Sequence, residues 1–141
     1  MTFHFSSTAP SHSYSAIEKL LFLNPDQHRV RNGIINSLDH FGHPKIGQAA
    51  TGLAIVVGDT EAQTLFAFDS SRIHGDPAGV VVFLRTSLEE MAIMHVAVDP
   101  KYCLRSSHDR LGLAIVLIEK VINISSKIVG VERLVLFYRP V

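Results

Sequence analysis

The stretch from Glu90 to Asn123 constrains the fold of this chain more than any other part of its sequence. It reads EMAIMHVAVDP, then KYCLRSSHD, then RLGLAIVLIEKVIN. Residues 91–98 are apolar except for His95, which predicts a central strand that is covered on both faces. Pro100 cannot donate a ladder hydrogen bond, so we expect the strand to end there. A polar loop then leads into an apolar helix.

The predicted helix begins near Asp109, which is a favourable N-cap residue. Its apolar stripe is predicted to comprise Leu111, Ala114, Ile115, Ile118, Val121 and Ile122. A strand, a polar loop and a helix N-terminus together can hold an anion, because the first helical turn leaves backbone N–H groups unpaired and carries partial positive charge. Gly112 would let a ligand approach the backbone closely. The same features also suit an ordinary crossover that binds nothing.

This stretch resembles the acyl-CoA-binding core of the GNAT superfamily of N-acetyltransferases. In that family a strand ends in an apolar triplet followed by one residue and proline, as Val96–Pro100 does here. A loop then ends in (Arg/Gln)-x-x-Gly-x-(Gly/Ala), and Leu111–Ala114 supplies the glycine turn before an apolar helix over 115–122. Two features depart from the pattern: Asp109 replaces the arginine or glutamine, and residues 103–108 lengthen the loop.

The resemblance implies a mixed α/β (α+β) fold, with a mostly antiparallel sheet and one β-α-β crossover around the acyl-CoA site. It implies that two N-terminal helices cover one face of the sheet and help to shape the acceptor site. Acetyl-CoA would be the co-substrate, and the activity would be transfer of an acetyl or other acyl group to a primary amine of a small molecule or peptide. The implied cofactor-binding residues are Val96, Val98, Arg105, Ser106, Ser107, Arg110, Leu111, Gly112, Leu113 and Ala114.

Acyl transfer to an amine needs a base that takes the amine proton, and two residues are candidates for this catalytic role. Glu90 lies at the start of the core strand, where some members of the family place a carboxylate base, and it shares the parity of Ala92, Met94 and Val96. His95 interrupts the most apolar strand and could accept the proton directly or through water. Each also has an ordinary interpretation: Glu90 as a solvated turn residue, and His95 as a satisfied core histidine.

The rest of the chain predicts a single domain over residues 1–141. The predicted elements before the core strand are a short strand over 2–5, helices over 14–23 and 26–41, a hairpin of strands 53–57 and 64–68, and a strand over 78–85. After the predicted helix, a strand over 133–138 should lie parallel beside the core strand. Its outer edge would be exposed, and we expect either a second copy of the chain, in a homodimer, or a docked terminus to cover it.

Composition limits the partners and the compartment. Thirteen basic and thirteen acidic residues balance, so there is no electrostatic case for nucleic acid or for an anionic membrane. Cys103 is the single cysteine, which excludes an internal disulfide and suits the reducing cytoplasm. The N-terminal residues do not form a secretory signal, and no apolar run reaches the length of a membrane span. No histidine or cysteine spacing predicts a metal site.

Two other functional readings stay open. The chain could be a degenerate, non-catalytic GNAT-like binding or interaction module, which Asp109 and the lengthened loop favour. In the family, the element after the last predicted strand usually carries a tyrosine that protonates the departing thiolate, and Tyr138 does not match that position. The chain could also be an unrelated α/β domain whose strand, loop and helix match the motif by chance. Binding of CoA separates the first two readings, and strand order bears on the third.

Overall fold

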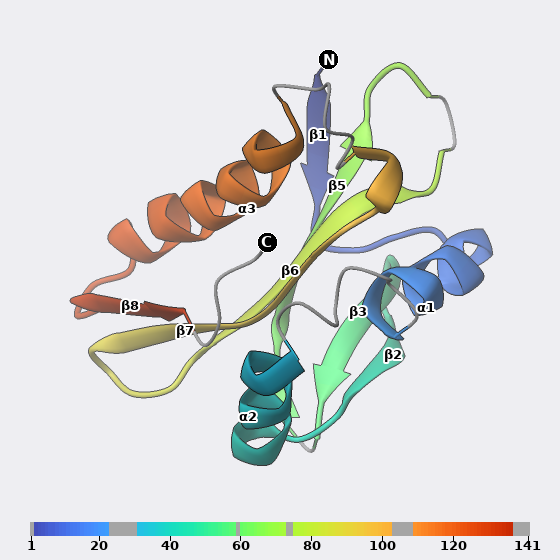
Figure 1. Cartoon of the computed structure of the whole chain (residues 1–141). Helices are drawn as coiled ribbons and strands as arrows, with labels where there is room; N and C mark the ends of the chain where they lie inside the picture. Colours follow the sequence, from blue (N-terminus) through green and yellow to red (C-terminus); the bar gives the residue numbers. More distant parts are fainter. Residues whose placement is uncertain (1, 23–30, 59, 73–74, 103–108, 137–141) are drawn as a thin grey trace.

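A computed structural model of the chain describes residues 2–22, 31–58, 60–72, 75–102 and 109–136. The described strands form a five-stranded sheet in the order β1-β5-β6-β7-β8 and a three-stranded sheet in the order β2-β3-β4 (Figure 1). The elements are β1 (Phe3–Ser6), α1 (Tyr14–Phe22), α2 (Arg31–Phe41), β2 (Pro44–Ala49), β3 (Gly52–Val57), β4 (Thr60–Glu61), β5 (Gln63–Asp69), β6 (Pro77–Arg85), β7 (Glu90–Val98), α3 (Asp109–Ser126) and β8 (Arg133–Leu136). Two short 3-10 helices, η1 (Ser11–Ser13) and η3 (Pro100–Tyr102), precede α1 and follow β7.

The five-stranded sheet is antiparallel from β1 through β7, and its last pair is parallel. Glu90 pairs with Arg133, and the parallel register continues to Ile93 opposite Leu136. Because parallel strands need a crossover, the chain passes through α3 between β7 and β8. The predicted mixed α+β fold with a mostly antiparallel sheet is therefore confirmed. The part of the last predicted strand beyond Leu136 lies outside the described residues.

The sheet separates two apolar layers (Figure 1). On one face the side chains of β6 and β7 pack against α3, and on the other they pack against α1. Along β6 the alternation is regular: Val81 and Phe83 belong to the α3 layer, whereas Val80 and Val82 belong to the opposite layer. These strands are nearly fully buried, which is why they read in the sequence as continuous apolar runs.

The predicted hairpin of β3 with β5 is wrong. β3 pairs along its whole length with β2, and β5 instead lies between β1 and β6 in the larger sheet. β2 has the sequence PKIGQA, in which Ile46 is the only large apolar residue, so its composition gave no strand signal. β3 and the sequence that forms β5 are both apolar, and their short separation in the chain favoured the wrong partner.

The predicted apolar stripe of α3 is rotated from the observed one. Leu113, Leu117 and Val121 are fully buried, whereas Ile115 and Ile122 are each 49% exposed. α3 carries apolar residues around most of its circumference, so its sequence alone does not fix which side faces the sheet. The sheet decides: a Cβ added at Gly79 of β6 would lie 3.1 Å from Leu117 Cδ1, so this glycine makes the room into which the helix packs.

A β-bulge in β7 changes which side chains share a face. Val82 of β6 lies opposite His95, and the next residue of β6, Phe83, lies opposite Ile93, so Met94 is the extra residue. As a result Ile93 and Val96 both belong to the α3 layer, and Met94 belongs to the layer under α1. The predicted common face of Glu90, Ala92, Met94 and Val96 is therefore wrong for Val96.

A buried hydrogen bond fixes this bulge to α2. The Ser37 hydroxyl donates to the carbonyl oxygen of Met94 at 3.0 Å, and Ser37 is fully buried. A bulge leaves backbone groups outside the regular ladder, and a buried carbonyl without a donor would cost free energy. The hydroxyl therefore both satisfies the bulge and joins α2 to the sheet.

Replacing Ser37 with alanine should destabilise the protein by about 1–2 kcal/mol, because the Met94 carbonyl loses a buried donor. Ser126→Ala is the matched control, since the Ser126 hydroxyl also donates to a carbonyl, that of Asn123, but at an exposed position. Urea denaturation of the two variants measures the difference. Equal losses of unfolding free energy in both would contradict the role assigned to the Ser37 bond.

Candidate functional site

A pocket of about 220 Å³ lies on the face of the sheet that α1 and α2 cover. Its walls and floor are formed by Leu21, Phe22, Ile34, Leu38, His43, Pro44, His95 and Ala97. We call this cavity the His95 pocket. The pocket therefore joins three parts of the chain: the end of α1, the segment from α2 to the start of β2, and the second half of β7.

His95 reaches this pocket because of the bulge. Without the extra residue, strict alternation would put His95 on the same face as Met91 and Ile93, under α3. Instead it lies opposite Val82 and lines the pocket with Ala97. The side chain is almost fully buried, and this burial lowers the pKa of His95 from its ordinary 6.5 to about 4. The imidazole is therefore neutral at physiological pH, with one nitrogen able to donate a hydrogen bond and one able to accept.

Two of the predicted cofactor-binding residues lie on the opposite face of β7. Val96 and Val98 are buried in the layer that α3 covers. Leu113 is 1% exposed, so its side chain belongs to the core and only its backbone could face a ligand. Ala114 is half-buried against the same layer.

Gly112 lies in the first turn of α3 beside open space. A Cβ built on it would meet no atom of the described residues within 4 Å. Glycine in a helix interior costs about 1 kcal/mol relative to alanine, and neither a left-handed φ nor close packing requires it here. None of the described residues therefore crowds the first turn of the helix on the side of Gly112.

Several predicted site residues lie outside what the structure describes. Arg105, Ser106 and Ser107 fall in the segment 103–108, and so does Cys103. Arg110 and Leu111 belong to the first turn of α3, but only their backbone is described. Their proposed contacts with phosphate therefore stay predictions.

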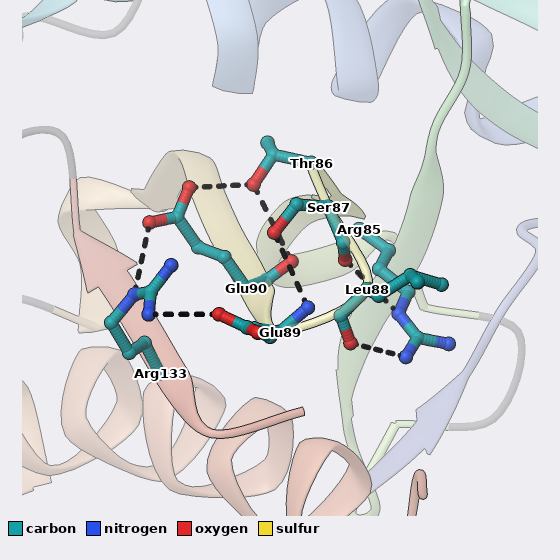
Figure 2. Close-up of polar contacts among 7 residues, drawn as sticks. All are labelled: Arg85, Thr86, Ser87, Leu88, Glu89, Glu90 and Arg133. Carbon is teal, nitrogen blue, oxygen red and sulfur yellow. Dashed lines mark hydrogen bonds and ion pairs between the residues drawn. The ribbon is translucent and has the colours of Figure 1, made fainter. Parts of the chain in front are cut away.

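The structure does not bring the two predicted bases together. Glu90 begins β7 and His95 lies five residues later, about 16 Å along a strand. The Glu90 carboxylate accepts a hydrogen bond from the Thr86 hydroxyl at 2.6 Å and lies 3.6 Å from Arg133 Nε (Figure 2). Arg133 also lies 3.4 Å from the Glu89 carboxylate. These are partly exposed ion pairs that join β7 to β8 at the end of the strand remote from the His95 pocket.

Arg85 ties two turns together at that same end. Its guanidinium donates to the carbonyl oxygens of Leu88, in the β6–β7 turn, and of Val129, in the turn before β8 (Figure 2 shows the Leu88 bond). The Glu89 carbonyl accepts from the backbone N–H groups of Glu132 and Arg133 at 2.7 and 2.9 Å. These contacts hold this end of the sheet together, and Glu90 takes part in them as a structural residue.

Sequence reasoning missed a polar contact that fixes the start of the crossover. The Tyr102 hydroxyl donates to Asp69 Oδ2 at 3.0 Å, and Ser71 donates to Oδ1 through its backbone N–H and its hydroxyl. The Ser71 hydrogen bonds hold the pKa of Asp69 below its ordinary value, and burial with the bond to Asp69 raises the pKa of Tyr102. Asp69 ends β5 and Tyr102 ends η3, so no local pattern in the sequence could join them.

A second hollow, of about 480 Å³, lies by β1 and β5 and is lined by hydroxyls of Ser6, Thr8 and Thr51 together with Arg72. The His4 ring stacks on Phe68 within it, with ring centroids 5.1 Å apart. It has no buried titratable side chain in its described lining, and it does not touch β7. The His95 pocket is therefore the better candidate for chemistry.

Comparison with protein-family models and with curated proteins finds no match to this chain. Among the described helices, none is both long enough and apolar enough to cross a membrane. Within the described ranges, no group of three or more histidine, cysteine, aspartate or glutamate residues is placed to hold a metal ion. The candidate site therefore has to be argued from its own geometry.

The lowered pKa of His95 predicts an acid-sensitive fold. In the unfolded chain His95 binds a proton near pH 6.5, and in the folded protein His95 binds it only near pH 4. Between these values the unfolded state holds more protons, so the unfolding free energy should fall as pH falls, by about 3 kcal/mol in total. Urea denaturation as a function of pH, with His95→Gln as reference, isolates this contribution because other groups titrate in both proteins. Parallel profiles for the two proteins would refute it, as would an imidazole resonance of His95 that titrates near pH 6.5.

Proposed function

We propose that this chain is a GNAT-type N-acyltransferase that moves an acetyl or other acyl group from acyl-CoA to a primary amine. One observation carries the proposal, and it concerns the two faces of the second half of β7. His95 and Ala97 line the pocket on one face, and Val96 and Val98 lie in the α3 layer on the other. In this proposal the thioester and the amine would meet at the edge of β7 beside His95 and Val96, beyond the residues 90–93 that pair with β8. Proximity of this kind is the first requirement of acyl transfer.

The order of strands supports the same proposal. An antiparallel meander, β5-β6-β7, followed by a single parallel crossover through α3 to β8, is the arrangement that the sequence resemblance implies. Two N-terminal helices on one face of the sheet also agree with it (Figure 1). The sheet of β2, β3 and β4 is additional to that arrangement.

The acyl-CoA would bind on the α3 side. A phosphate would bind to the backbone N–H groups of the first helical turn beside Gly112, where no described residue lies within 4 Å of an added Cβ and the helix dipole favours negative charge. Arg105, Ser106, Ser107 and Arg110 remain the proposed side-chain partners of the pyrophosphate.

His95 would be the base, and Glu90 has no part in this mechanism because its carboxylate is held by Thr86 and Arg133. The apolar walls of the His95 pocket disfavour an ammonium ion, so the amine would enter or become neutral there. As its nitrogen bonds to the thioester carbonyl, the amine proton becomes acidic and passes to the neutral imidazole. A backbone N–H group of β7 would stabilise the oxyanion, and the departing CoA thiolate would take the proton back from His95.

Two further points belong to the proposal. We place the enzyme in the cytoplasm, in keeping with a single cysteine and balanced charge. β8 is an edge of the described sheet, and a homodimer through that edge stays a prediction.

Calorimetry with acetyl-CoA tests the function. The wild-type protein should bind in the micromolar range, and Gly112→Glu should abolish binding because the new carboxylate fills the space beside the first turn. The substitution should not unfold the helix, since glutamate is a better helix former than glycine and suits an N-terminal turn. Ile122→Glu is the matched control: it adds the same charge to the same helix at an exposed position and should bind normally.

An absence of binding at millimolar acetyl-CoA would overturn the enzymatic proposal and favour the non-catalytic GNAT-like module. Equal losses in Gly112→Glu and Ile122→Glu would show that the charge of the helix, and not the open space beside Gly112, decides binding.

A further inference from the structure

Among the described residues that line the His95 pocket, none carries a negative charge. Of its eight described residues, six are apolar and two, His43 and His95, are imidazoles. An ammonium ion that enters such a pocket loses its hydration and meets no carboxylate of the described lining, which is strongly unfavourable. His43 lies at an exposed position, and in either protonation state it adds no negative charge. The described lining therefore favours an uncharged guest.

The size and shape of the pocket restrict this guest further. Its volume of about 220 Å³ is below the range of about 300–1,000 Å³ that is usual for drug-sized ligands. The apolar lining includes Leu38, Ile34 and Ala97. The neutral imidazole of His95 is the buried polar group among the described lining residues. A guest with one ring and one polar substituent matches this volume and this lining.

We propose that the His95 pocket selects a compact arylamine, whose nitrogen is uncharged at neutral pH, over a cationic alkylamine or polyamine. This inference deepens the proposed function and rests on it for the statement that the guest is the acyl acceptor. The pocket then does not have to strip a proton from the amine before the reaction. An alkylamine with the basicity of lysine is neutral in only about 1 molecule in 2,500 at pH 7. The nitrogen of an arylamine contacts His95, which takes its proton during acyl transfer.

Three six-membered-ring probes separate charge from shape: aniline, cyclohexylamine and cyclohexanol. Aniline and cyclohexanol are uncharged at pH 7, and cyclohexylamine is cationic. Binding to the wild-type protein, without acyl-CoA, is followed through NMR shifts of His95 and Ala97. We expect aniline and cyclohexanol to shift both residues, and cyclohexylamine to bind weaker by about tenfold or more.

Two variants of α1 provide the matched comparison. Phe22 lines the pocket and is 42% exposed, so Phe22→Glu places a carboxylate at its mouth without emptying the core. Tyr14 is another exposed aromatic residue of α1, 49% exposed, and does not line the pocket. Phe22→Glu should narrow the gap between cyclohexylamine and aniline, and Tyr14→Glu should leave it unchanged.

Tight binding of cyclohexylamine to the wild type, equal to that of aniline, would overturn the inference. So would a failure of all three probes to shift His95 and Ala97. Weak binding of cyclohexanol together with cyclohexylamine would also overturn it, because aromaticity and not charge would then be the basis of selection.

The outcome is independent of the calorimetric test of function. Selective aniline binding in a protein that does not bind acetyl-CoA would support the pocket's selectivity and overturn the acyltransferase proposal. Acetyl-CoA binding in a protein that takes cyclohexylamine as well as aniline would overturn only the selectivity.

Discussion

One extra residue in β7, held by one buried hydrogen bond, determines how this site is arranged. Met94 interrupts the register with β6, and the Ser37 hydroxyl satisfies its carbonyl from α2. Since side chains alternate along a strand, a single inserted residue exchanges the faces of every residue beyond it. His95 is thereby moved out of the α3 layer and into the pocket under α1 and α2. The bulge interrupts the regular hydrogen bonding between β6 and β7, and the Ser37 hydrogen bond from α2 offsets this loss next to the His95 pocket.

The two ends of β7 have different roles. At its start, Glu90 and Arg133 hold β8 in parallel register (Figure 2). Arg85 joins the two neighbouring turns through its bonds to the Leu88 and Val129 carbonyls. These contacts are partly exposed, so each contributes little to stability, and together they fix geometry. At its end, burial keeps His95 neutral. There His95 and Ala97 line a pocket on one face, and Val96 and Val98 pack in the α3 layer on the other. A neutral imidazole in an apolar pocket suits chemistry on an amine that is itself uncharged.

The sequence was most informative where burial makes it distinctive. The apolar run of β7, the parallel strand that begins at Arg133 and the crossover helix between them were all predictable from pattern alone. The partner of β3 was not, because Ile46 is the only large apolar residue of β2 and the pairing of that strand depends on tertiary packing. The buried side of α3 was not, since the helix is apolar on most sides and Gly79 selects the contact. His95 was recognisable as a candidate from its apolar surroundings, but its pocket depends on Met94, and a bulge leaves no periodic signal.

Backbone amide shift mapping with acetyl-CoA tests the central claim most directly, because β7 is proposed to hold the acyl donor on one side and the acceptor pocket on the other. The account predicts shifts at Val96, Val98 and residues 112–114, with the walls of the His95 pocket in α2 unaffected. Shifts confined to α2 and the pocket, or to the hollow by β1, would contradict it, because the acyl donor would then not lie between β7 and the first turn of α3.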